Sequence, residues 1–138
     1  MSWDTYYQRK SVIDAVLAEV AETHTDEIPV SWHTEITEVF GGEDEFLLAV
    51  HYRWGNTLCA RLDALLESPP QDTGAKVRQI WQALAAEQPT TVSLLARYGD
   101  RPLLVTAIRR QQRQLAWALG VDVAEFTQSG VEPVEAAA

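Results

Sequence analysis

Cysteine is almost absent from this chain. Cys59 is the only one among 138 residues, so no disulfide can form within the chain. There is also no apolar run near twenty residues, which is the length that a membrane-spanning helix needs, and the first residues do not have the pattern of a signal peptide. We therefore expect one cytoplasmic domain that folds without disulfides and does not enter a membrane.

The usual signatures of catalytic sites are missing as well. The sequence has no Glu-x-x-His pair, no His-Glu-x-x-His motif, no glycine-rich phosphate loop and no nucleophile elbow. Glu35 and Glu38 lie three residues apart and close to His33. A helical metal site would need a histidine on the same helical face as these glutamates, and this segment has none in that register. We expect no catalytic residues, no metal and no cofactor.

What the chain has in excess is acid, and the excess lies in the first half. Residues 1–67 contain thirteen Asp and Glu against four Lys and Arg, whereas residues 68–138 contain seven of each, so the net charge of −9 belongs to the first half. An acidic surface repels the phosphates of nucleic acid and suits a basic protein partner. The simpler alternative is a set of solvated helix faces that keep the protein in solution.

Apolar residues recur at helical spacing through most of the chain. The first predicted helix covers residues 3–23, with an inward stripe of Tyr6, Ile13, Leu17 and Val20. After Pro29, Ser31 is a candidate N-cap for a short helix that carries Trp32, Ile36, Val39 and Phe40 and ends at Gly41 and Gly42. The longest stripe predicts a central helix over residues 43–67, formed by Leu47, His51, Trp54, Leu58, Leu62 and Leu65.

Within that central helix, Gly55 predicts a close approach by a neighbouring helix or a bend of the axis. Pro69 and Pro70 break the pattern, and further helices are expected over residues 72–88 and 92–98, the latter capped by Thr90 or Thr91. The last helix begins near Pro102, presents Leu104, Ile108, Leu115 and Leu119 inward, and ends at Gly120.

These patterns predict an all-α protein of about six helices in a single compact domain, orthogonal or bundle-like, over residues 1–120. Residues 121–138 are acidic, rich in small residues and without useful periodicity, so we expect a flexible tail there. No strand pattern or internal repeat competes with this reading.

His51 is the most informative titratable residue, because its place on the apolar stripe predicts that it is buried. A core histidine bonded to a carbonyl group is the simplest interpretation. The alternative is a polar contact in an apolar ligand pocket lined by Trp54, Leu58 and Trp81. Cys59, with no base nearby, is expected to be a small core residue and not a nucleophile.

Three arginines, Arg109, Arg110 and Arg113, gather on the last predicted helix with glutamines between them. Such a patch can contact nucleic acid or an acidic partner, including the acidic half of a second copy in a homodimer. The alternative is a solvated polar face beside a core stripe.

Two segments resemble TetR-type transcriptional regulators. The first runs from Phe40-Gly41-Gly42 through Val50 to Leu66, and it is similar to the junction between the DNA-binding domain and the first ligand-domain helix of that family. The second runs from Trp81 to Pro102 and has the style of the ligand domain. The resemblance implies a helical dimer that binds a small molecule between helices, with Trp54, Leu58 and Trp81 near the pocket. The chain departs from the family over residues 24–39, which leave room for one short helix where the family has two, so we expect its helix-turn-helix to be degenerate.

We therefore expect a non-enzymatic helical binding or regulatory protein, a TetR-like relic or compact cousin that binds a protein or a small apolar ligand. One alternative is a DNA-binding regulator that uses the helix of Arg109 to Arg113, whose binding would collapse as salt rises. Another is an enzyme built around His51 and a carboxylate.

Overall fold

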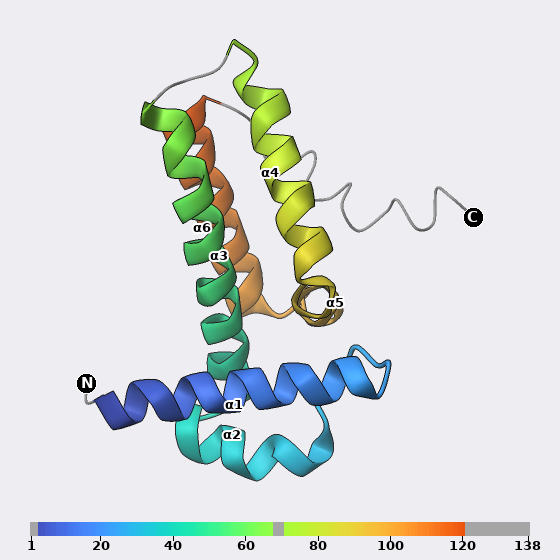
Figure 1. Ribbon diagram of the computed structural model, residues 1–138. Helices are drawn as coiled ribbons and strands as arrows, with labels where there is room; N and C mark the ends of the chain where they lie inside the picture. Colours follow the sequence, from blue (N-terminus) through green and yellow to red (C-terminus); the bar gives the residue numbers. More distant parts are fainter. Residues whose placement is uncertain (1–2, 68–70, 121–138) are drawn as a thin grey trace.

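The computed structural model describes residues 3–67 and 71–120 of the chain. Within these residues it contains six α-helices, one short 3-10 helix and no strand (Figure 1). The helices are α1 (Trp3–Glu22), η1 (Val30–Trp32), α2 (His33–Phe40), α3 (Glu43–Glu67), α4 (Thr73–Glu87), α5 (Pro89–Arg97) and α6 (Pro102–Leu119). The all-α prediction is confirmed, and the predicted tail over residues 121–138 lies outside the described residues.

The helices form two groups that share α3. In Figure 1, α1 and α2 lie across the lower end of α3, whereas α4 and α6 run alongside the rest of it and the short α5 lies at the lower end of α4. The arrangement is orthogonal in the lower group and bundle-like in the upper one. None of the helices in the described ranges is long and apolar enough to cross a membrane.

The core has two parts, and α3 contributes to both. Phe46, Leu47 and Val50 of α3 are buried against α1, α2, Leu94 of α5 and Leu104 of α6. Further along α3, the second part contains a buried set from α3, α4 and α6, namely Trp54, Leu58, Leu62, Val77, Leu84 and Leu115. The predicted inward stripe of the central helix is therefore confirmed, because all of its members are buried except Leu65, which is partly buried.

Local signals define most of the helix ends. Gly41 after α2 and Gly120 after α6 have φ angles of 95° and 67°, the left-handed conformation that glycine adopts most easily. The side chain of Asp72 accepts a hydrogen bond from the backbone N–H of Ala75 at 3.0 Å and so caps α4. The glycine ends of α2 and α6 are those that the sequence predicted, whereas the cap by Asp72 was not predicted.

Two predicted helix starts were wrong. Ser31 does not cap α2, because Pro29 begins a 3-10 turn that contains Ser31 and leads directly into α2. The fifth helix begins at Pro89 and not after Thr90 or Thr91, since a proline fits the first helical turn, where its missing N–H has no partner to lose. Thr91 consequently lies inside α5 and is buried.

The inward position of Tyr6 was also wrong. The buried side of α1 consists of Val12, Ile13, Val16 and Val20, while the side chain of Tyr6 is 53% exposed. The helix α1 extends further than the helices it packs against, and its N-terminal end projects past α2 and α3 (Figure 1). Tyr6 lies on this projecting end and therefore has no core to enter.

Candidate functional site

His51, the residue singled out in the central helix, connects α3 to α6. It is 9% exposed, and its ring forms a hydrogen bond with the backbone carbonyl of Ala107 on α6. Burial lowers the pKa of His51 below its ordinary value of 6.5, and the hydrogen bond to Ala107 offsets part of that effect. His51 is thus held mainly in its neutral form inside the helix interface, as the core interpretation of this residue expects.

The three apolar pocket candidates lie together in the second part of the core. The rings of Trp54 and Trp81 meet edge to face, with centroids 5.4 Å apart at an angle of 80°, and Leu58 belongs to the same cluster. Trp54 is 4% exposed, so the indole rings themselves occupy the space between α3 and α4. A ligand at this place would have to displace one of them.

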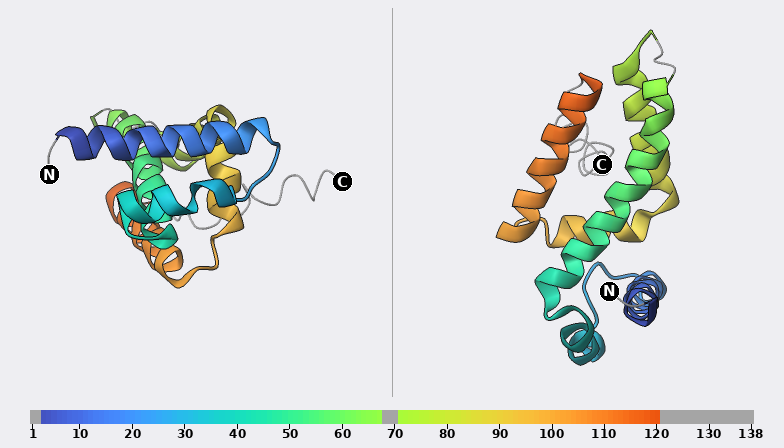
Figure 2. Two further views of the ribbon diagram at one scale, coloured as in Figure 1. Left: turned by 90° about the horizontal axis from the view of Figure 1, so that it is seen from below. Right: turned by 90° about the vertical axis from the view of Figure 1, so that its left-hand side faces the viewer.

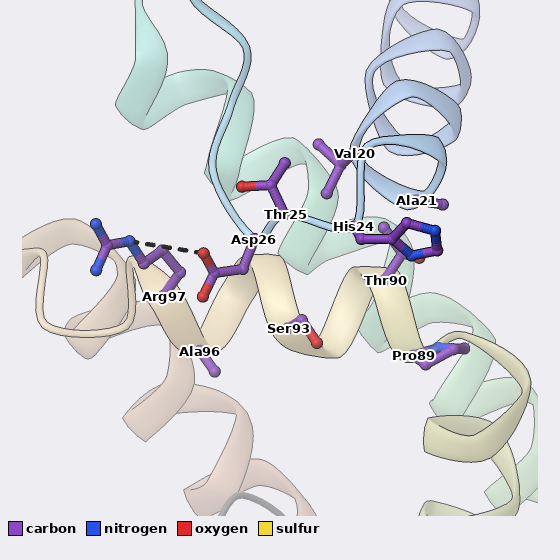
Figure 3. Close-up of a pocket in the computed structure, with 10 residues that line it drawn as sticks. All are labelled: Val20, Ala21, His24, Thr25, Asp26, Pro89, Thr90, Ser93, Ala96 and Arg97. Carbon is purple, nitrogen blue, oxygen red and sulfur yellow. Dashed lines mark ion pairs between the residues drawn. The ribbon is translucent and has the colours of Figure 1, made fainter.

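The described residues do contain a depression of about 970 Å³, but it lies elsewhere. Figure 3 shows it between the end of α1, the loop after it and α5, and its lining is Val20, Ala21, His24, Thr25, Asp26, Pro89, Thr90, Ser93, Ala96 and Arg97. Arg97 is bound there by Asp26 at 4.0 Å and by Glu27 at 2.5 Å. The lining is mostly polar and its one arginine already has two carboxylate partners, so the depression has no free charge to offer a ligand.

The arginine patch predicted on the last helix lies on the outer side of α6. Arg109, Arg110 and Arg113 are all exposed, while Leu104 and Leu115 on the opposite side of the helix are buried. Two further side chains share the outer side: Trp117, which is 91% exposed, and Leu103, which is 46% exposed. We call these five residues the α6 outer face.

No ion pair or hydrogen bond within the described part of the chain involves the three arginines of this face. Most of the other basic side chains whose contacts are known pair with carboxylates: Lys10 and Arg53 with Asp14, Arg61 with Glu87, Arg97 with Glu27, and Arg101 with Glu43 and Asp44. In addition, α6 itself contains no Asp or Glu. The α6 outer face is therefore a basic surface on an acidic protein, and it includes the exposed indole of Trp117.

Trp117 and Leu103 were not predicted as part of this surface, although the sequence contains a signal for them. Leu103, Thr106, Arg110, Arg113 and Trp117 recur at spacings of three and four residues, which places them on one side of a helix. The more conspicuous apolar stripe of Leu104, Ile108, Leu115 and Leu119 lies on the other side of the helix.

A second group of exposed aromatic rings lies on the projecting end of α1. Trp3, Tyr6 and Tyr7 contact one another, with ring centroids 5.4 to 6.2 Å apart, and all three are more than half exposed. This cluster was not predicted either, but its spacing of i, i+3 and i+4 would have indicated it.

The remaining chemical candidates do not form a site among the described residues. Those residues contain no group of three or more His, Cys, Asp and Glu side chains that could hold a metal, and His33 pairs with Glu43 at 3.3 Å. Cys59 is exposed, so its prediction as a core residue was wrong, because it lies one position past the Leu58 stripe. Partial desolvation and the nearby Asp63 raise the pKa of its thiol, which disfavours the nucleophilic thiolate.

Comparison with models of protein families, with curated proteins and with solved structures finds no match to this chain. The function is therefore inferred from the residues of the α6 outer face and their surroundings.

Proposed function

We propose that this protein is a non-enzymatic helical binding protein, a compact cousin of TetR-type regulators, and that a protein partner docks on the α6 outer face. The observation that carries the proposal is the combination of Trp117 at 91% exposure with three arginines that lack an ion pair within the described residues. Tryptophan and arginine are the residues that most often dominate the energy of protein interfaces.

The energetics of this face favour a partner over bare solvent. Burying a large apolar side chain contributes about 1.5 to 3 kcal/mol to binding. A partner on α6 would bury the exposed side chain of Trp117 and the exposed part of Leu103. Arginine adds bidentate hydrogen bonds to carboxylates, which are stronger in an interface that excludes water. An acidic protein surface would satisfy both kinds of residue at once.

The arrangement of the helices supports the resemblance to TetR-type regulators. In those proteins one helix leads from the DNA-binding domain into the ligand domain, and here α3 runs from the lower helix group into the upper one. Between α1 and α3 there are only η1 and the eight-residue α2, where the family has the two helices of its DNA reader. This difference favours a protein partner over operator DNA as the target.

A charge-reversal experiment tests the proposed function. The double variant Arg110→Glu/Arg113→Glu and the matched double variant Lys76→Glu/Arg78→Glu, which makes the same change of charge on α4, are produced in the source cells and purified at low salt. Circular dichroism first establishes that both are folded. We expect one protein to co-purify with the wild type and the α4 variant and to fall at least tenfold with the α6 variant. Equal recovery with all three forms, or recovery of nucleic acid alone, would refute the proposal.

A further inference from the structure

The α6 outer face has a regular geometry that says what shape of partner it can receive. Four of its residues form a stripe along α6 together with Thr106, at spacings of three, four, three and four residues: Leu103, Thr106, Arg110, Arg113 and Trp117. This is the repeat by which one helix packs lengthwise against another. Trp117 lies fourteen residues after Leu103, which is about 21 Å along the axis of α6.

The chemistry along the stripe is segregated. An apolar residue lies at each end, Leu103 near the start of α6 and Trp117 near its end, and the cationic Arg110 and Arg113 lie between them with Arg109 beside them. A complementary partner therefore has carboxylates in its middle and apolar side chains at both ends. An α-helix supplies that pattern with side chains spaced three and four residues apart, as α6 itself does.

Among residues 3–67 and 71–120, no helix covers this side of α6, whose Arg109, Arg110, Arg113 and Trp117 are exposed. Its extensive packing is against α3, and the right-hand view of Figure 2 shows α6 at one edge of the upper helix group.

On the basis of the proposed function, we infer that the docking segment of the partner is an acidic amphipathic α-helix that lies along α6. It places its carboxylates against Arg110 and Arg113 and its apolar ends against Leu103 and Trp117. The α6 face of a second copy does not fit, because it would bring six arginines together without a counter-charge. Nucleic acid lacks the apolar ends and is repelled by the acid-rich first half of the chain.

Synthetic peptides of about 18 residues test this inference on the full chain, since shorter helices are marginal in water. The acidic peptide has glutamates at helical spacing between leucines in its first and last turns. One control peptide has lysine in place of each glutamate, and a second has a central proline that breaks the helix. Binding is measured by calorimetry, and NMR shifts show whether α6 is the contact.

We expect the acidic helix to bind at α6, the proline peptide to bind at least tenfold more weakly, and the lysine peptide not to bind. The variant Arg110→Glu/Arg113→Glu should reverse the preference and bind the lysine peptide. Equal binding of the acidic and proline peptides would overturn the helical partner, while the proposed function would stand on its co-purification test. A further variant replaces Asp122, Glu125, Glu132 and Glu135 with Asn or Gln. If the acidic peptide binds only to this variant, these four acidic residues of the chain itself compete for the face, and the inference of a partner helix would also be overturned.

Discussion

Gln111 of α6 lies directly over Gly55 of α3. Its side-chain amide nitrogen is 2.6 Å from the position that a β-carbon on residue 55 would occupy. Because Gly55 is buried, the two helices approach each other closely here, and the sequence had predicted either this close approach or a bend. The contact is one helical turn past His51, whose bond to Ala107 joins the same two helices.

A large side chain at residue 55 should separate α3 from α6. We expect Gly55→Leu to lower the free energy of unfolding by about 1 to 3 kcal/mol, the usual effect of overpacking a well-filled interface. The measurement is urea denaturation followed by circular dichroism. The control is Gly55→Ala, which only needs the flexible end of Gln111 to move and gains about 1 kcal/mol of helix propensity. A Leu variant as stable as the Ala variant would contradict the close approach.

The buried Trp54 and the exposed Trp117 should differ in how much their replacement by alanine lowers the stability of the fold. Trp54 is 4% exposed and packs against Trp81, so Trp54→Ala should lower the free energy of unfolding by about 3 to 5 kcal/mol. Trp117 is 91% exposed, and Trp117→Ala should change the free energy of unfolding by no more than about 0.5 kcal/mol. Denaturation curves of the two variants test this difference. A loss below about 1 kcal/mol for Trp54→Ala would refute the register of α3.

Buried His51 makes stability depend on pH in a defined direction. Its pKa is lowered in the folded state, so below about pH 6.5 the unfolded chain binds a proton that the folded chain resists. The stability contributed by neutral His51 is therefore fully present above pH 6.5 and is lost as the pH falls towards the folded-state pKa. In urea titrations at several pH values, His51→Gln should have a flatter dependence than the wild type in this range. His24→Gln, at an exposed position, is the control. Parallel curves for His51→Gln and the wild type would show that His51 is not responsible.

Most of the fold could be predicted because its signals are local. Apolar stripes, prolines and glycines are read within a few turns of chain, and they located all six helices and the buried side of α3. The errors came where a local pattern has two physical outcomes. Pro89 ends one helix and also starts the next, and the stripe that contains Tyr6 says nothing about whether the rest of the molecule reaches that end of α1.

The candidate site was only half visible in the sequence. The patch of Arg109, Arg110 and Arg113 could be predicted, because a cluster of basic residues without acidic neighbours is recognisable from the sequence alone. That these arginines form no ion pair with the described part of the chain could not be predicted, because ion pairing depends on carboxylates that are distant in sequence. The same reason explains why the burial of His51 was predicted while its partner Ala107, on another helix, was not.

The most direct test of the account is photo-cross-linking from Thr106, which lies on the stripe of the α6 outer face between Leu103 and Arg110. A photoreactive amino acid is placed at residue 106, or at the exposed Gln82 of α4 as control, and the protein is irradiated in its source cells. We predict a single protein adduct from residue 106, none from residue 82, and loss of that adduct when Trp117→Ala and Arg113→Glu are added. Adducts of equal yield from both positions, or an adduct that survives those two substitutions, would contradict the claim that a partner docks on α6.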